Sequence, residues 1–228
     1  MIEGKTVLAI VPARGGSKGV FRKNIREVAG KPLIAWTIEE VKKSKYVDRF
    51  ILSSEDAEII RTAERLGCDV PFIRPAELAQ DDTPGIAPVL HAIETLAAVY
   101  DYVVLLQPTS PLRRAEDIDG CMELCLRRNA PACVSVTQSA YNPYWMFTVN
   151  GNGQMTPVMP SACTFYRRQD LPTIYAVNGA VYVAKREWLQ EKKTFISDET
   201  IAYRMPEERS LDIDSEFDLR VFACLAAL

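Results

Sequence analysis

The sequence predicts an α/β fold in which helices cover both faces of a mostly parallel β-sheet. Short, nearly continuous apolar runs are typical of strands that are buried on both faces. These runs alternate with longer helical segments, at βαβ spacing, through about residue 137. Because the chain has 228 residues, 48% of them hydrophobic, it can form one large domain with a substantial core. We therefore expect a single domain over residues 1–228.

The first part of the chain supplies the parallel sheet. The first helix begins near Pro32, and the second is capped by Asp56 and stopped at Gly67. The expected strands are 6–11, 49–53, 70–73, 103–106 and 133–137, and the expected helices are 32–43, 56–66, 86–100 and 117–128. Ligands bind at the carboxyl ends of such strands, so the loops after residues 11, 53, 73 and 106 should share one edge.

The pattern changes after residue 137. Two short runs, 146–149 and 154–158, flank the turn sequence Asn-Gly-Asn-Gly and are typical of a β-hairpin. Strands at 180–184 and 202–205 follow, around a short helix near Glu187, and the last helix covers about 215–227. We interpret approximately 140–205 as including a small insertion, suited to a lid or a subunit contact.

Composition excludes several classes of protein. The net charge of −3 argues against a nucleic-acid binder, which usually has a basic surplus. His91 is the only histidine, so zinc chemistry that needs several histidines is impossible. The six cysteines form no C-x-x-C pair, and even Cys121 and Cys125 are better explained as small buried thiols than as metal ligands. No apolar run approaches the roughly 18 residues of a membrane span, and no leader precedes the first strand, so we expect a cytoplasmic protein with no membrane partner.

A basic, glycine-rich loop follows the first strand directly. This loop, Pro12–Asn24, contains three glycines and four cations, Arg14, Lys18, Arg22 and Lys23. Glycines let the backbone approach a ligand closely, and backbone N–H groups combined with cations suit a triphosphate. It is not a Walker A loop, because no G-K-[ST] closes it. The alternative is a solvated basic turn.

The loop resembles the N-terminal signature of the CMP-sialic acid synthetases, the acylneuraminate cytidylyltransferases. Six further stretches resemble motifs of that family in the same order along the chain: Gly30–Leu33, Ser53–Asp56, Arg74–Ala79, Leu106–Arg113, Asn178–Tyr182 and Asp212–Asp218. The resemblance implies a Rossmann-like nucleotidyltransferase sheet. It also implies transfer of CMP from CTP to a nonulosonic acid, with N-acetylneuraminate as the favoured acceptor and Mg²⁺ as the cofactor. It also implies a homodimer formed through the late insertion, with Phe195 as a candidate contact.

The resemblance also assigns residues to the nucleotide. Arg14, Ser17, Lys18 and Lys23 would hold the phosphates, and Ala13, Asn24 and Arg74 would hold the cytidine. Lys23 and Arg14 would also act in catalysis, and Lys23 would help to neutralise charge on the leaving pyrophosphate. For Arg74 the alternative is a surface salt bridge.

Two aspartates are the expected metal ligands. Asp212 and Asp214 are two residues apart, so in an extended segment they face the same side. Paired carboxylates suit Mg²⁺, which would orient the triphosphate and draw charge from the α-phosphate. Asp212 is also a candidate general base. The alternative is that Asp214, Glu216 and Asp218 form a helix cap and an acidic first turn.

The resemblance places Gln107, Arg168, Asn178 and Tyr182 at the acceptor. Arg168 would grip the sugar carboxylate, because a guanidinium can bind a carboxylate through two hydrogen bonds. Gln107 could instead be a turn residue before Pro108, and Asn178 and Tyr182 ordinary strand residues.

The sequence identifies the acceptor sugar less narrowly than the nucleotide donor. Asn142–Trp145 stands where some sialic acid enzymes have a lysine, and it is more similar to relatives that act on legionaminic-type sugars. An eight-carbon KDO acceptor is a further alternative, although those enzymes typically have a second arginine where Lys18-Gly19 stands. A nucleotide-binding regulator without turnover is a rival of another class, against which Lys23 and the aspartate pair argue.

Overall fold

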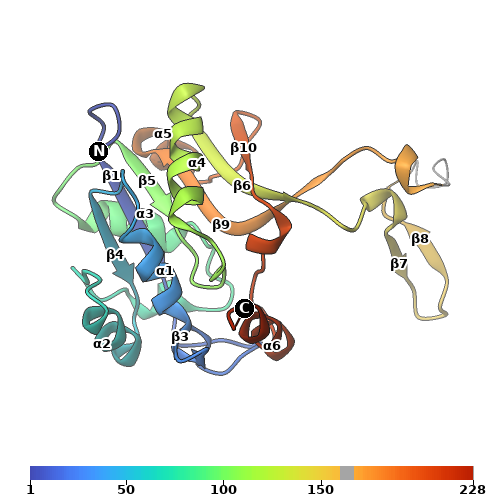
Figure 1. Ribbon diagram of the computed structural model, residues 1–228, viewed down its shortest axis with the longest axis horizontal. Helices are drawn as coiled ribbons and strands as arrows, with labels where there is room; N and C mark the ends of the chain where they lie inside the picture. The colour runs from blue at the N-terminus through green and yellow to red at the C-terminus, as the bar shows by residue number, and fades with distance from the viewer. Residues whose placement is uncertain (160–166, 228) are drawn as a thin grey trace.

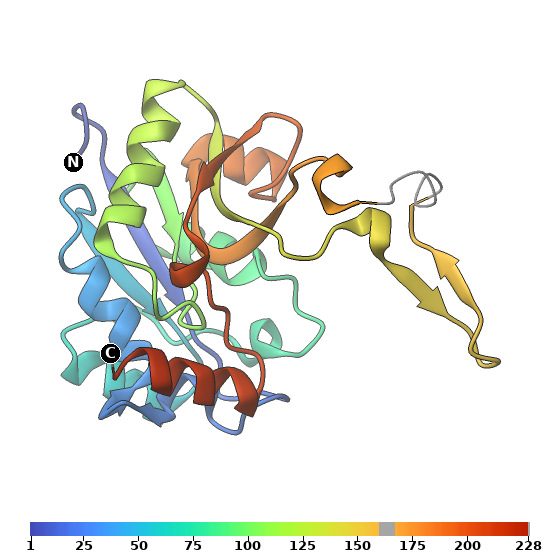
Figure 2. The ribbon, with the colours of Figure 1, turned by 45° about the vertical axis from the view of Figure 1, so that its right-hand side comes forward.

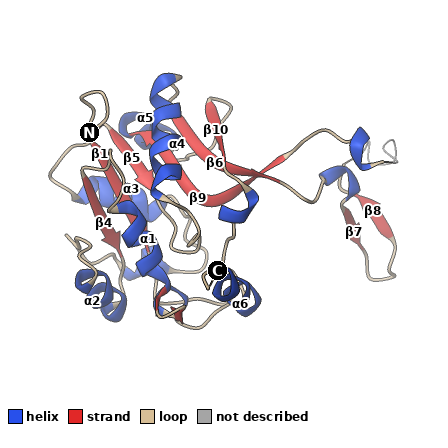
Figure 3. Ribbon diagram, in the orientation of Figure 1, coloured by secondary structure: helices blue, strands red, loops and turns tan. Residues whose placement is uncertain are grey.

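The computed structural model describes residues 1–159 and 167–227, and for Arg168 only the backbone. In this part of the chain, six strands form one sheet in the order β10-β6-β9-β5-β1-β4 (Figures 1 and 3). They are β1 (Val7–Pro12), β4 (Arg49–Ser53), β5 (Tyr102–Leu105), β6 (Ala132–Gln138), β9 (Tyr175–Lys185) and β10 (Thr200–Arg204). Of these, β9 runs antiparallel to both neighbours, and the other pairs are parallel. The expected mostly parallel α/β sheet is confirmed.

Helices cover both faces of the sheet. They are α1 (Leu33–Val41), α2 (Ala57–Arg65), α3 (Ala87–Thr95), α4 (Ala115–Arg127), α5 (Arg186–Lys192) and α6 (Glu216–Leu225). Side chains of β1 alternate between the two cores: Val7, Ala9 and Val11 pack with α1, α2 and α4, whereas Leu8 and Ile10 pack with α3 and α5. Because β1 is buried on both faces, its sequence is a continuous apolar run.

Two expected elements in the first part of the chain differ in the structure. Residues 70–73 form no strand; only Asp69 bridges to β4, through Ile51. Pro71 explains the difference, because proline has no N–H to donate to a neighbouring strand. The helix expected at 86–100 ends at Thr95, where Leu96 turns to an extended conformation and packs against the core.

The late segment divides into two parts. β9 and β10 belong to the main sheet, and β9 lies at its centre between β6 and β5. The described residues between β6 and β9, 139–159 and 167–174, project away from the sheet in both views (Figures 1 and 2). We call this segment the arm. It carries the predicted hairpin, β7 (Phe147–Val149) paired with β8 (Met155–Pro157).

Smaller features complete the fold. Two short strands, β2 (Glu27–Val28) and β3 (Lys31–Pro32), pair after the basic loop. Cys68, Cys121, Cys125, Cys133 and Cys224 are free thiols, whereas Cys163 lies outside the described residues. Over the described ranges, no helix has the length and apolarity needed to cross a membrane.

Candidate active site

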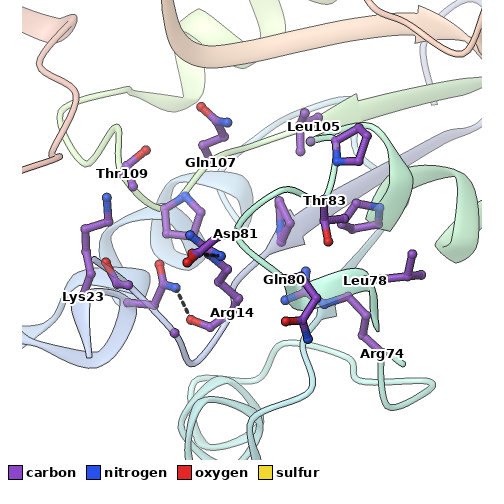
Figure 4. A pocket seen from close by; sticks show the side chains of 18 of the residues that line it. Arg14, Lys23, Arg74, Leu78, Gln80, Asp81, Thr83, Leu105, Gln107 and Thr109 are labelled. Carbon is purple, nitrogen blue, oxygen red and sulfur yellow. Dashed lines mark hydrogen bonds and ion pairs between the residues drawn. The ribbon is translucent and has the colours of Figure 1, made fainter. Parts of the chain in front are cut away.

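A pocket of about 340 Å³ opens at the carboxyl edge of β1 and β5 (Figure 4). This is the edge that the sequence predicted, and the size falls within the usual range for small-molecule sites. The described residues that line it are Pro12, Arg14, Gly16, Ser17, Lys23, Asn24, Arg74, Leu78, Gln80, Asp81, Thr83, Pro84, Gly85, Pro88, Leu105, Gln107, Pro108, Thr109, Asp212 and Asp214. Residues assigned to the nucleotide, the metal and the acceptor therefore meet in one cavity.

Lys23 joins the basic loop to the aspartate pair. Its Nζ donates to the carbonyl oxygen of Ile213 at 2.7 Å and lies 3.1 Å from Asp214 Oδ1. The Ile213 N–H donates to the Thr109 carbonyl oxygen at 2.8 Å, which ties the same segment to the loop after β5. Gly19 packs so closely on the Asp214 carbonyl oxygen that any side chain there would overlap it. Three distant segments thus close one wall of the pocket.

The cationic side chains of the basic loop point in different directions. Arg14 and Lys23 line the pocket, with Arg14 and Asp81 between Lys23 and Arg74 in the view of Figure 4. Arg22 instead forms two hydrogen bonds with Asp56, at 2.7 and 3.0 Å, and a third with Glu58. Arg22 is not among the described residues of the lining, so it belongs to the scaffold rather than to the expected phosphate site.

Asn24 and Arg74 are buried around the loop. The Asn24 Nδ2 donates to the Arg14 carbonyl oxygen at 2.9 Å. Ala13, which precedes Arg14, is buried. Arg74 is only 3% exposed, and its Nε has no hydrogen-bond partner among the described residues. Arg74 therefore lines the pocket with a side chain that keeps one buried N–H without a partner among the described residues.

Glu55 is a residue that the sequence reasoning missed. Its Oε1 accepts from the Gly15 N–H at 2.7 Å, and its Oε2 lies 2.5 Å from Arg74 Nη2. The salt bridge considered as an alternative role for Arg74 therefore exists, but it is part-buried, with Arg74 3% and Glu55 20% exposed, and it holds Arg74 beside the pocket. The available signal was an acidic residue in the turn directly after β4, at the ligand edge.

The aspartate pair faces the pocket as expected. Both side chains line it, and the helix cap belongs to other residues: Ser215 and Asp218 form a capping box at α6. Asp214 is therefore not the cap that the sequence allowed. Desolvation in the pocket, together with the charge of Asp214, raises the pKa of Asp212 against an opposing hydrogen bond from Thr109.

The pair can hold a metal only together with a ligand. Among the residues with described placement, no group of three or more His, Cys, Asp or Glu side chains could hold an ion. Mg²⁺ commonly binds through one or two carboxylates, with substrate phosphates and waters completing its coordination. Asp212 and Asp214 therefore fit a magnesium ion that arrives with a triphosphate.

The raised pKa gives a stability prediction for Asp212→Asn, in the absence of divalent cations. A carboxyl whose pKa is raised by folding destabilises the folded state once it ionises, so its removal should raise the melting temperature at neutral pH. The gain should shrink as the pH falls toward the usual carboxyl pKa of about 4. Thermal melts over this range measure it.

Asp218→Asn is the matched control with the opposite sign. Burial opposes the shift, but hydrogen bonds from Ser215 and the Asp214 N–H lower the pKa of Asp218. Its charge therefore stabilises the fold at neutral pH, and Asp218→Asn should lower the melting temperature there. An Asp212→Asn protein that melts below wild type at neutral pH would contradict the interpretation of Asp212.

Gln107 is the one acceptor candidate that the structure places in the described pocket lining. Gly179 lies against its Oε1, with φ of +73°, a conformation that side chains rarely adopt. Behind it, the buried Arg113 donates to the carbonyl oxygens of Gln107 and Ala180, at 3.1 and 2.9 Å. Burial lowers the pKa of Arg113 to about 10. These contacts hold the segment that follows β5 against the middle of β9, behind Gln107.

The other acceptor candidates are not among the described residues of the pocket lining. Asn178 is 5% exposed, and its amide is engaged with Ser135 at 2.6 Å and Ser210 at 2.9 Å, so the structure does not bring it to the pocket. Tyr182 packs against Phe195 with ring centroids 5.5 Å apart. Phe195 is itself 6% exposed in the core, so it is not available as the expected subunit contact. Arg168 begins a short 3₁₀ helix in the arm, Arg168–Asp170, and its side chain lies outside the description.

The fold and the pocket define an α/β protein with cations and carboxylates together at the carboxyl edge of its sheet, a combination that suits a triphosphate. Residues 8–219 match the family described as Cytidylyltransferase. The chain belongs to this family.

Curated relatives agree with this membership. A CMP-N,N'-diacetyllegionaminic acid synthase of Legionella pneumophila is 32% identical, covering 93% of this chain and 92% of its own. A pseudaminic acid cytidylyltransferase of Campylobacter jejuni is 35% identical, with the same coverage of both chains. An N-acylneuraminate cytidylyltransferase of Streptococcus agalactiae is also 35% identical, over 92% of this chain but 51% of its own.

Solved structures share the fold. A CMP:2-keto-3-deoxy-manno-octonic acid synthetase complexed with CTP superposes with a TM-score of 0.74, at 15% identity, over 97% of this chain and 98% of its own. A 4-diphosphocytidyl-2C-methyl-D-erythritol synthase of Anaerococcus prevotii superposes with a TM-score of 0.67, at 16% identity, over 97% and 96%. At these identities the likeness shows the fold alone.

Proposed function

We propose that this cytidylyltransferase transfers CMP from CTP to the anomeric hydroxyl of a nonulosonic acid and releases pyrophosphate. The observation that carries the proposal is the single pocket in which the basic loop, Arg74, Gln107 and the aspartate pair meet. The names of the three relatives described above, all enzymes of nonulosonic acids, support this acceptor class.

The residues of the pocket divide the work of the reaction. Arg14, Ser17 and Lys23 of the lining bind the triphosphate, together with Lys18, which lies outside the described lining but pairs with Asp81 in it. Asn24 and Arg74 of the lining bind the cytidine, together with the backbone of Ala13, which lies between the lining residues Pro12 and Arg14. Lys23, held between Ile213 and Asp214, is positioned to stabilise the charge that develops on the leaving pyrophosphate. A magnesium ion held by Asp212 and Asp214 would withdraw charge from the phosphates when bound. The protein contributes positioning and charge stabilisation, and no protein nucleophile is needed.

The acceptor is proposed at the level of the nonulosonic class. Sequence reasoning favours N-acetylneuraminate, whereas Asn142–Trp145 favours a legionaminic-type sugar. In the structure, Asn142 caps a turn at the base of the arm: its Oδ1 accepts from the Tyr144 N–H at 3.2 Å, and its Nδ2 donates to the Pro172 carbonyl oxygen at 3.0 Å. This stretch therefore shapes the base of the arm, next to the segment that carries Arg168.

A pyrophosphate-release assay tests the proposal. The enzyme is incubated with CTP, Mg²⁺ and N-acetylneuraminate, legionaminate, pseudaminate or KDO in separate reactions. We expect turnover with at least one nine-carbon acid and a lower kcat/KM with KDO. If CTP binds but no acid releases pyrophosphate, the chain is a nucleotide-binding regulator and the proposal fails.

We further propose that a second copy of the chain covers the arm. Val149 pairs with Met155, and Phe147 pairs with Pro157, so these four residues share one face of the hairpin. Val149 and Met155 are 64% and 61% exposed. An apolar face on a projecting hairpin is typical of an interaction site, and a homodimer is the assembly that the sequence resemblance implied.

The double substitution Val149→Glu with Met155→Glu should convert the dimer to a monomer. Two carboxylates would be buried without partners in the interface, at a cost of several kcal/mol. Size-exclusion chromatography with light scattering measures the change. Thr148→Glu with Thr156→Glu, a cross-strand pair on the opposite face, is the matched control and should stay dimeric. A wild-type monomer at micromolar concentration would contradict the assembly.

A further inference from the structure

Asp81 bridges two cations of the basic loop. Its Oδ1 lies 2.7 Å from Arg14 Nη1, and its Oδ2 lies 2.9 Å from Lys18 Nζ. Two oxygens of one anion that span two neighbouring cations reproduce the contacts that a phosphate chain would make there. Asp81 is in the pocket lining and lies beside Arg14 (Figure 4).

A compact turn presents this carboxylate to the pocket. The turn follows the 3₁₀ helix Ala76–Ala79 and precedes α3. Thr83 closes it: the Thr83 N–H donates to the Gln80 carbonyl oxygen at 3.3 Å, and the Thr83 hydroxyl donates to the Glu77 carbonyl oxygen at 3.1 Å. Gln80 and Thr83 also line the pocket, so the turn meets the basic loop at one wall of the cavity.

The two ion pairs are suited to exchange. Asp81 is 47% exposed, Lys18 is 79% exposed and Arg14 is 34% exposed, and ion pairs this open to water contribute little to stability. Hydrogen bonds from Lys18 and then Arg14 lower the pKa of Asp81, so the carboxyl is ionised at neutral pH. A triphosphate carries several negative charges and would take both cations, but a carboxylate left beside it would repel it.

We propose that Asp81 is a competing counterion for the triphosphate. It pairs with Arg14 and Lys18 in the empty pocket, releases them when CTP binds, and takes them back as pyrophosphate leaves. The inference rests on the proposed function, because that function assigns the two cations to the phosphates. Asp81 thereby weakens the binding of both the substrate and the product polyphosphate, which limits inhibition by pyrophosphate.

Isothermal titration calorimetry of Asp81→Asn with CTP and with inorganic tripolyphosphate, both without divalent cations, tests this inference. The amide keeps the shape of the side chain but not its charge. We expect the Kd for each ligand to fall by about threefold to tenfold at low salt, from the loss of two exposed competing pairs. The gain should shrink at high salt, because ions screen exposed charges. Pyrophosphate should inhibit the variant at correspondingly lower concentrations.

Asp82→Asn is the matched control. It makes the same change in net charge one residue along, and Asp82 is absent from the described pocket lining. Its Kd values should stay within about twofold of wild type. Equal or weaker binding by Asp81→Asn, or an equal gain by Asp82→Asn, would overturn the inference.

Arg14→Gln separates this failure from failure of the proposed function. If Arg14→Gln weakens tripolyphosphate binding while Asp81→Asn does not strengthen it, the phosphate site stands and the role of Asp81 is wrong. If Arg14→Gln has no effect either, the phosphate site itself is misassigned.

Discussion

Asp214→Asn is expected to lower turnover by about 100- to 1,000-fold, the range for removing a group that stabilises charge in a transition state. Asp214 is 80% exposed at the pocket, so the change removes little packing. Its carboxylate pairs with Lys23 at 3.1 Å and, with Asp212, supplies the hard oxygens that suit Mg²⁺. Asparagine retains the shape but loses the charge. Pyrophosphate release at saturating CTP and Mg²⁺ measures the effect.

Glu216→Gln is the control for Asp214→Asn. Glu216 lies two residues further on, in the first turn of α6, and lies outside the described pocket lining. It removes the same charge near the same segment and should retain most activity. Near-normal CMP-sugar formation by Asp214→Asn, with an unchanged melting temperature, would rule out the metal assignment.

Lys23→Met is expected to have a comparable effect, again about 100- to 1,000-fold in turnover. Lys23 is 14% exposed and is held by Ile213 and Asp214, so its ammonium group is fixed where the triphosphate is proposed to bind. Methionine keeps a similar apolar length without the charge. If Lys23 stabilises charge on the leaving group, kcat should fall more than KM rises. Steady-state kinetics with varied CTP separates the two parameters.

Arg22→Met is the matched control for Lys23→Met. Arg22 carries the same charge one position earlier, but its guanidinium binds Asp56 and Glu58 away from the pocket. We expect a lower melting temperature, by about 2–4 °C for a loss of about 1 kcal/mol, with turnover per folded molecule largely kept. A loss of turnover equal to that of Lys23→Met would show that the loop needs its total charge rather than one placed cation.

The fold was predictable where local signals were strong. β1 and β5 are buried on both faces, so their sequences are apolar throughout, and Asp56 caps α2 through the N–H groups of Glu58 and Ile59 as expected. The position of β9 was not predictable. An antiparallel strand that returns to the centre of a parallel sheet comes after the arm and lacks the βαβ spacing that identifies its neighbours.

The sequence also did not predict which residues contact the basic loop. Glu55 and Asp81 bind residues of the basic loop from turns that lie 40 and more residues away along the chain. Their carboxylates are ordinary surface residues when read locally. Only the convergence of the strand ends brings them to the loop.

The sequence by itself determined the α/β class, the edge of the sheet at which the pocket opens, the basic loop and the aspartate pair. Each of these follows from residues adjacent in the chain, whose spacing encodes strand, turn or charge. The tertiary structure decided which side chains reach the pocket. Arg22 adopts a left-handed φ of 54° and turns to Asp56, Lys23 faces Asp214, and Asn178 is buried in the sheet. A side chain's direction depends on backbone dihedrals and distant partners, which neighbouring residues do not specify.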